Sequence, residues 1–222
     1  MTTSIPSLRY ELKFIANGLG LNEVLAFVKR HTAAFHETYP ARVVNNIYLD
    51  SPGRGDYHDH VNGVGNRSKT RIRWYGEPRG VIERPTLERK VKRGVVSGKE
   101  SHPLPVFCMN GGSVNAPVQA AISSAKLPEM LQLALRQREP ALFNRYHRHY
   151  FVSGDGRFRL TVDSGLKFAG VAPKIFPLPA NPAVIVELKF GPEFADDASL
   201  VTNVMPFRVA RFSKYVAGIE RM

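Results

Sequence analysis

The chain has 222 residues, of which 43% are hydrophobic, and this is enough for one domain with a real core. Its net charge of +12 makes an anionic partner the first expectation, and no apolar run approaches the ~20 residues of a membrane span. The single cysteine, Cys108, excludes an internal disulfide and a cysteine-rich zinc site. With no apolar signal core at the N-terminus, the composition predicts a cytoplasmic protein.

The first part of the chain predicts two strands, a helix and a glycine-rich connection. Residues 8–15 alternate between polar and apolar side chains, which is typical of a strand. Residues 22–31 read as a helix capped by an asparagine, and residues 43–50 read as a strand that ends at a Ser-Pro-Gly turn. The stretch 53–67 contains four glycines and predicts irregular turn structure.

The next strand carries a cation at every second residue. Lys69, Arg71 and Arg73 point to one face, and Ile72 and Trp74 point to the other, because successive strand side chains alternate. Three cations in a row repel one another unless the face meets an anion. The strand therefore predicts contact with a polyanion.

The rest of the chain continues with similar strands and two helical regions. Further strands are predicted over residues 86–92, 145–152, 157–163 and 183–190. A hairpin turn is predicted over 94–100, mixed helices and connections over 103–140, and a helix over 206–221.

These strands, about seven or eight in number, form an antiparallel-looking series with one apolar and one charged face. In an open sheet or sandwich the charged face would meet solvent. In a closed barrel under helices the charged face would line a lumen. The alternation fits both arrangements.

In a barrel, nine cations and four carboxylates would share the lumen: Arg9, Lys13, Lys69, Arg71, Arg73, Lys90, Arg148, Arg159, Lys189, Glu11, Glu88, Asp163 and Glu187. Burying that many unpaired cations would cost several kcal/mol each. A water-filled tunnel with a bound polyphosphate removes this cost, because Arg and Lys match phosphate oxygens. The carboxylates could then hold Mg²⁺ or Mn²⁺ against the phosphates.

Eight short motifs follow one another in a characteristic order. They are Arg9-Tyr10-Glu11-Leu12-Lys13, Ile47-Tyr48-Leu49-Asp50, Lys69-x-Arg71-x-Arg73-x-Tyr75, Leu87-Glu88-Arg89-Lys90, Arg145-Tyr146-His147-Arg148, Arg159-Leu160-Thr161-Val162-Asp163, Val186-Glu187-Leu188-Lys189 and Phe212-Ser213-Lys214-Tyr215. From about residue 8 to 220, the chain resembles the VTC domain. This is the polyphosphate polymerase domain of vacuolar transporter chaperone complexes, within the triphosphate tunnel metalloenzymes of the CYTH-like superfamily.

The resemblance implies an α+β fold: an antiparallel β-barrel tunnel of about eight strands with flanking helices and a C-terminal helix. It also implies transfer of the ATP γ-phosphate to a polyphosphate chain, with Mn²⁺ or Mg²⁺. Phosphate contacts are then expected from Lys13, Arg71, Arg73, Lys90, Tyr146, Arg148, Arg159, Ser213 and Lys214, and the alternation adds Lys69 and Lys189. Lys90, Arg148 and Lys214 are the expected catalytic residues. Glu187 is the expected metal ligand, with Glu11 and Glu88 as further candidates.

One departure separates the chain from the wider superfamily. That group opens with Glu-x-Glu-x-Lys, whereas Arg9 stands here in place of the first glutamate. The change disfavours a two-metal hydrolase. A tunnel triphosphatase and a non-catalytic polyphosphate-binding module remain as alternatives. Nucleic-acid binding is disfavoured, because the aromatic residues lie opposite the cations rather than between them.

Overall fold

The computed structural model describes residues 9–94, 96–110, 112–171, 176–181 and 183–222. Leu8 and Val95, which belong to the expected first strand and hairpin turn, lie outside the described residues. The helices are α1 (Leu21–Arg30), α2 (Gly55–Val61), α3 (Asn115–Ser123), α4 (Glu129–Leu135), α5 (Ala198–Thr202) and α6 (Lys214–Ile219), with a 3₁₀ turn at Pro192–Phe194. The strands are β1 (Tyr10–Ala16), β2 (His36–Asp50), β3 (Asn66–Tyr75), β4 (Gly80–Ile82), β5 (Thr86–Arg93), β6 (Val96–Pro103), β7 (Phe107–Met109), β8 (Glu139–Val152), β9 (Phe158–Gly170), β10 (Phe176–Asn181) and β11 (Val184–Phe190).

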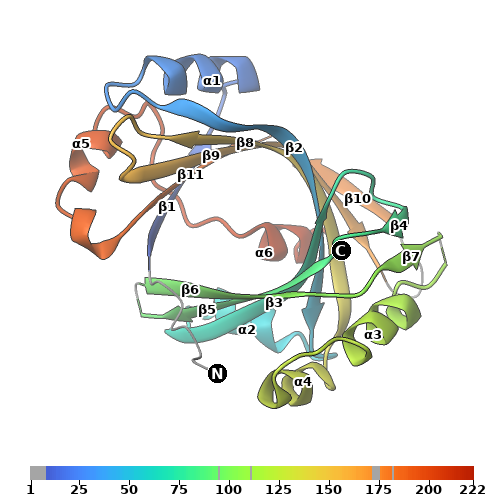
Figure 1. Cartoon of the computed structure of the whole chain (residues 1–222). Coiled ribbons are helices and arrows are strands. Elements are labelled where there is room, and N and C mark those ends of the chain that lie inside the picture. The colour runs from blue at the N-terminus through green and yellow to red at the C-terminus, as the bar shows by residue number, and fades with distance from the viewer. Residues whose placement is uncertain (1–8, 95, 111, 172–175, 182) are drawn as a thin grey trace.

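Eight strands curve into a barrel in the order β1-β11-β9-β8-β2-β3-β5-β6, and all neighbours are antiparallel (Figure 1). The two edge strands meet where Arg9 and Ser97 exchange backbone hydrogen bonds of 3.3 and 3.4 Å. β10 extends from β9, and β4 pairs with β7 in a separate small sheet. The expected α+β barrel is confirmed.

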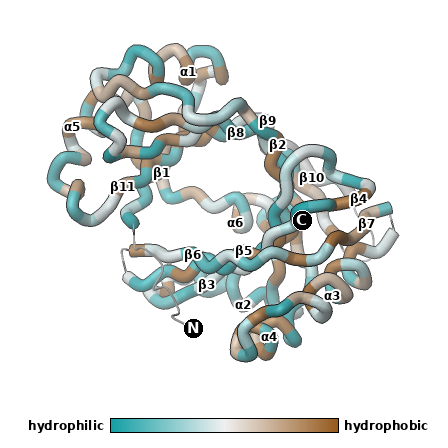
Figure 2. The backbone as a smooth tube through the Cα atoms, viewed as in Figure 1, coloured by the Kyte–Doolittle hydropathy of each residue, from teal (hydrophilic) through white to brown (hydrophobic). Residues whose placement is uncertain are grey.

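The outer face of the barrel is apolar and is covered by helices at two places. Ile72 and Trp74 of β3 pack in one cluster with residues of α3 and α4, such as Val118 and Leu131. Strands β1, β9 and β11 pack in a second cluster under α1 and α5. Figure 2 shows the resulting mixture of hydrophobic and hydrophilic residues along the strands. Burial of these outward side chains leaves the polar face of each strand for the lumen.

Helix α6 lies inside the outline of the barrel (Figure 1) and packs on its inner face. Its residues Tyr215 and Ile219 join a buried cluster with Leu142, Phe168 and Ile185. These strand residues lie where β8 and β11 begin and β9 ends, so α6 occupies that end of the lumen. The other end, where β2 and β9 begin, is the open end discussed below.

Several expected element boundaries were wrong. Most of the turn expected over 94–100 belongs to strand β6, and the strands expected over 145–152 and 157–163 extend back to Glu139 and on to Gly170. The stretch 53–67 contains α2, because Asp50 accepts hydrogen bonds from the first turn and offsets the glycines. The tail is helical only over Lys214–Ile219, since Val209 forms an isolated bridge with Phe14 of β1 and Ala210 donates to the backbone oxygen of Lys13. The strand expected over 43–50 begins earlier, at His36.

No helix among the described residues is long and apolar enough to cross a membrane.

Candidate functional site in the barrel lumen

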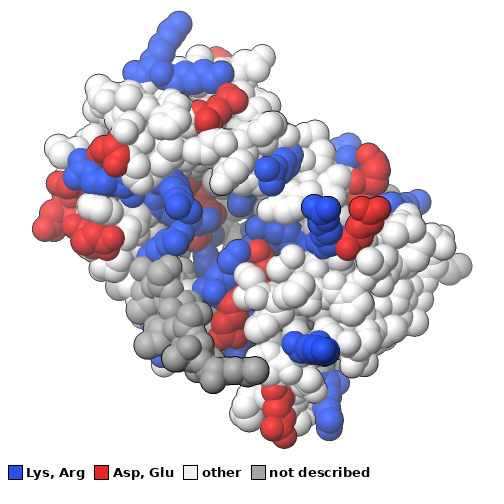
Figure 3. Space-filling view, viewed as in Figure 1, with Lys and Arg blue, Asp and Glu red and all other residues white. Residues whose placement is uncertain are grey.

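The lumen is a hollow lined by cations. The space-filling view shows Lys and Arg side chains gathered around a central depression, with a few carboxylates between them (Figure 3). Within the described part of the chain, each of the four expected lumen carboxylates contacts at least two cations. The barrel therefore brings together charged side chains from seven strands and from α6.

Glu88 organises the β3–β5–β6 wall of the lumen. Arg71 donates to it through Nε and Nη2, at 2.8 and 2.6 Å. Lys99 donates at 2.8 Å, and Arg73 Nη1 lies 3.6 Å away. Burial raises the pKa of Glu88, but Arg71, Arg73 and Lys99 outweigh it and hold that pKa well below the usual range. Glu88 is therefore an ionised anchor that fixes three cations.

A buried polar chain fixes Arg73 more firmly than its neighbours. Its Nε donates to Asn46 Oδ1 at 3.0 Å, and its Nη2 donates to Tyr146 Oη at 3.1 Å. Asn46 in turn donates to Asn144 Oδ1 at 2.7 Å. The guanidinium is thus held in one orientation before any ligand binds, which lowers the entropy cost of gripping a phosphate.

Asp163 organises the opposite wall. Arg148 makes a bidentate pair with it at 2.6 and 2.7 Å, and Lys214 from the start of α6 donates to the same carboxylate at 2.5 Å. Lys214 Nζ also lies 4.6 Å from the ring centroid of Tyr146. Burial raises the pKa of Asp163, but the two cations outweigh burial and lower it to about 2.

Glu11 and Glu187 form a carboxylate pair on the neighbouring strands β1 and β11. Lys13 contacts both, at 3.0 Å from Glu11 and 4.0 Å from Glu187. Lys90 bonds Glu11 at 2.6 Å, and Lys189 bonds Glu187. Burial and Glu187 raise the pKa of Glu11, yet Lys13 and Lys90 outweigh them and lower it to about 2. The pKa of Glu187 is also lowered far below its usual range, so both carboxylates are ionised at neutral pH.

Lys69 lies beside these clusters, and no carboxylate of the described residues forms an ion pair with it. Its Nζ donates to Ser213 Oγ at 2.9 Å. Burial, followed by the nearby cations Lys13 and Lys90, lowers its pKa to about 6. A phosphate oxygen beside Lys69 would raise this pKa and favour the charged ammonium form.

The donor chemistry of the lumen fits a hard divalent cation. Glu11 and Glu187 are ionised oxygen donors on one face, and Mg²⁺ or Mn²⁺ needs only one or two carboxylates when phosphates supply the other ligands. Glu88 is committed to three cations and lies in a different cluster. In the described part of the chain, no three His, Cys, Asp or Glu side chains gather as a preformed metal cage.

The structure places ten of the expected phosphate-binding residues in these clusters, and only Arg159 lies apart, exposed at the open end opposite Lys189. Ser213 and Lys214 lie inside the lumen, where α6 begins. The sequence reading missed Asn46 and Tyr48 as lumen residues. Both residues alternate with apolar residues along β2, but this part of the strand carries no cation that would have indicated a lumen position.

Comparison with known proteins decides the family. The family model described as the VTC domain matches residues 8–222. The chain belongs to the VTC domain family. No sequence among the curated proteins matches this VTC-domain chain.

Two solved structures share the fold of this VTC-domain chain. One is a Vibrio parahaemolyticus protein provisionally described as an adenylate cyclase, with 12% identity, 96% of this chain and 99% of that chain covered, and a TM-score of 0.54. The other is the PH1819 protein of Pyrococcus horikoshii OT3, with 13% identity, the same coverages and a TM-score of 0.52. At this identity the likeness concerns the tunnel fold alone.

Proposed function

We propose that this VTC-domain chain is a metal-dependent polyphosphate polymerase that transfers the γ-phosphate of ATP to a polyphosphate chain in the cytoplasm. The observation that carries the proposal is the number of lysine and arginine side chains in the lumen: among the described residues they outnumber the carboxylates, and Lys69 forms an ion pair with none of these carboxylates. A polymerase must bring an anionic donor and an anionic acceptor together. This requires more positive charge than an attack by neutral water does.

The geometry suits phosphoryl transfer without a covalent intermediate. Such transfer depends on positioning and on stabilising charge at the phosphoryl oxygens. Arg73 and Arg148 are held rigidly by their neighbours and would fix the donor phosphates. Lys214 and Lys90 reach the lumen from opposite sides and would neutralise the charge that develops on the leaving and transferred groups.

Glu187, with Glu11 beside it, would hold the divalent cation. When bound, this ion would neutralise phosphate charge as a Lewis acid. The protein's part is to keep both carboxylates ionised, which Lys13, Lys90 and Lys189 do. These lysines would turn to the phosphates when the ion takes their place.

One observation favours a second candidate, hydrolysis of a triphosphate. Helix α6 packs across one end of the lumen, so a long product would leave by the end through which ATP enters. A released phosphate is small enough to avoid this conflict. The two candidates share the site and differ in the acceptor.

Incubation with ATP and Mn²⁺, followed by gel electrophoresis of the products, separates the candidates. A ladder of polyphosphate supports the polymerase, whereas free phosphate alone assigns the hydrolase. Absence of any turnover would leave a binding module and overturn the proposal. Glu187→Gln is expected to reduce turnover at least about 100-fold, because losing even a residue that orients a metal ligand costs about 10–100-fold. Glu129→Gln, an exposed glutamate on α4, serves as the matched control.

A further inference from the structure

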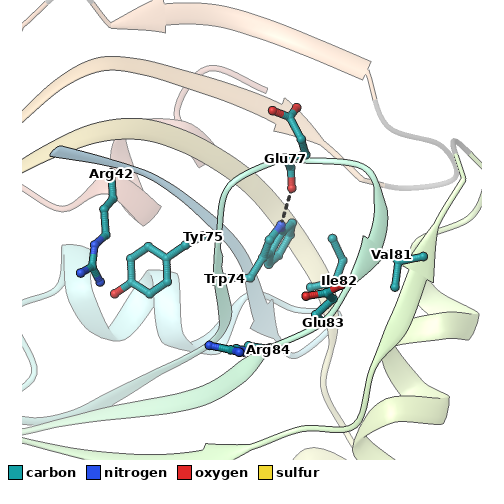
Figure 4. A pocket seen from close by; sticks show the side chains of 8 residues that line it. All are labelled: Arg42, Trp74, Tyr75, Glu77, Val81, Ile82, Glu83 and Arg84. Carbon is teal, nitrogen blue, oxygen red and sulfur yellow. Dashed lines mark hydrogen bonds between the residues drawn. The ribbon is translucent and has the colours of Figure 1, made fainter. Parts of the chain in front are cut away.

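A cavity of about 450 Å³ opens at the rim of the barrel, beside the end of β3. Figure 4 shows Arg42 and Tyr75 side by side at one part of it, with Trp74 and the segment carrying Ile82 and Glu83 at the other. The Trp74 indole donates to the backbone oxygen of Glu77 at 2.9 Å, which fixes this wall. The volume lies within the range of small-molecule sites, roughly 300–1,000 Å³.

Arg42 is the centre of an aromatic platform next to this cavity. Its guanidinium carbon lies 5.2, 5.5 and 5.9 Å from the ring centroids of Tyr39, Tyr75 and Tyr150. Tyr39 and Tyr75 are 56% and 49% exposed, which is unusual for two large aromatic side chains so close together. Tyr39 and Tyr150 also meet edge to face, with ring centroids 5.9 Å apart.

The platform continues the phosphate-binding face of the lumen toward the open end. In the β2–β8 register Arg42 lies opposite Arg148, and in β3 Tyr75 follows Arg73 by two residues. Two residues along a strand correspond to about 7 Å. A triphosphate gripped by Arg73 and Arg148 would therefore end beside Arg42 and Tyr75.

The position of α6 decides which end of a nucleotide can lie here. The helix occupies the opposite end of the lumen with a buried apolar cluster around Tyr215. The bulky nucleoside then has room only at the open end, and the terminal phosphate points inward to Lys69 and Lys214.

We propose that Arg42, Tyr39, Tyr75 and the cavity beside them bind the nucleoside of the nucleotide whose triphosphate enters the lumen. This proposal rests on the proposed function, because it takes the lumen as the triphosphate site. A nucleobase stacks on tyrosine rings and on a guanidinium plane. Glu83 in the cavity wall can accept hydrogen bonds from the sugar hydroxyls. The platform thus distinguishes a nucleoside triphosphate from inorganic triphosphate.

Binding of two ligands by calorimetry tests this proposal: the β,γ-imido analogue of ATP, which resists transfer, and inorganic triphosphate. Arg42→Ala and Tyr75→Ala are expected to weaken the ATP analogue about tenfold, as for loss of one stacking partner. Both variants should leave the affinity for inorganic triphosphate unchanged. Arg30→Ala, an exposed arginine at the end of α1, is the charge-matched control and should change neither affinity.

The outcomes separate this inference from the proposed function. Unchanged binding of both ligands in the variants would overturn the nucleoside site. Equal weakening of both ligands would also overturn it, because Arg42 would then be a phosphate ligand. If the wild-type protein binds neither ligand, the proposed function itself fails. Melting temperatures within about 2 °C of wild type would show that the variants are folded.

Discussion

Inside the barrel, each carboxylate serves as a fixed anchor for several cations. Asp163 is fully buried and holds Arg148 and Lys214, while Glu88 holds Arg71, Arg73 and Lys99. A cation paired in this way is held toward the lumen, and its carboxylate partner offsets the desolvation cost of burying the charge. These cations are therefore already ordered before an anion binds, which reduces the entropy cost of binding.

Removal of one anchor should show how much the pairing contributes to stability. Asp163→Asn leaves Arg148 and Lys214 buried without their counter-charge, and we expect a loss of about 3 kcal/mol in the free energy of unfolding. Urea denaturation measures the change. Asp197→Asn removes an exposed partner of Arg157 and should cost less than about 1 kcal/mol. Equal effects of the two substitutions would contradict the anchoring role.

Lys69 should make the stability of the protein depend on pH. Burial and neighbouring cations lower its folded pKa to about 6, against an ordinary 10.5, so between these values the unfolded chain binds the extra proton. The free energy of unfolding should therefore rise with pH through this window, by at most about 1.4 kcal/mol per pH unit. Lys69→Met should remove this part of the slope, as measured by urea denaturation from pH 6.5 to 8.5. Parallel curves for the two proteins would refute the assignment.

At the scale of elements, α6 is both a structural plug and a carrier of functional groups. Asp50 at the end of β2 accepts a hydrogen bond from Tyr215 and also caps the backbone of α2. The helix is thereby fixed in depth inside the barrel. This depth places Lys214 against Asp163 and Ser213 against Lys69.

The close packing of α6 predicts that a side chain at Gly218 lowers the stability of the protein. A Cβ there would lie 2.3 Å from Leu142 Cδ2 and 2.7 Å from Phe168 Cδ1, so these buried side chains or α6 must move. Alanine favours a helix over glycine by about 1 kcal/mol, yet we expect Gly218→Ala to destabilise the protein by about 1–3 kcal/mol, because overpacking outweighs propensity. Thermal unfolding measures this. Gly53→Ala, where a Cβ meets nothing within 4 Å, is the control, and a more stable Gly218→Ala would show that α6 is loosely held.

The start of β2 shows why the aromatic platform could not be predicted from the sequence. Pro40 interrupts the pattern of residues 36–42, and the pairing with β8 shifts register around it. Proline is unusual inside a sheet and indicates an edge or a bulge. The first half of β2 was therefore missed, and Arg42 and Tyr39 were missed with it.

For the whole molecule, closure of the sheet gathers a row of repelling cations around one lumen. β1 and β6 lie at opposite ends of the strand order and are joined through Arg9 and Ser97. Closure brings the cations of β1, β3 and β5 around one lumen, and the net charge of +12 adds a long-range field that attracts anions.

This charge distribution predicts strong stabilisation by a polyanion. Inorganic triphosphate at about 100 times its dissociation constant should add about 2.7 kcal/mol, or roughly 5–10 °C in melting temperature for a chain of this size. The shift should shrink at high ionic strength, because salt screens the attraction. Arg71→Gln should reduce the shift, whereas Arg30→Gln on α1 should not. A shift insensitive to salt and to Arg71 would place the anion elsewhere.

The sequence by itself determined most strands of the barrel, their two faces and most of the charged residues of the lumen. It could do so because side chains alternate strictly along a strand, so Lys69, Arg71 and Arg73 must share a face wherever the strand lies. Only the tertiary structure decided that this face points inward, that α6 fills one end, and which carboxylate holds which cation. These features depend on contacts between residues far apart in the chain, such as Lys13 with Glu187 and Arg9 with Ser97. Periodicity within one segment carries no information about such contacts.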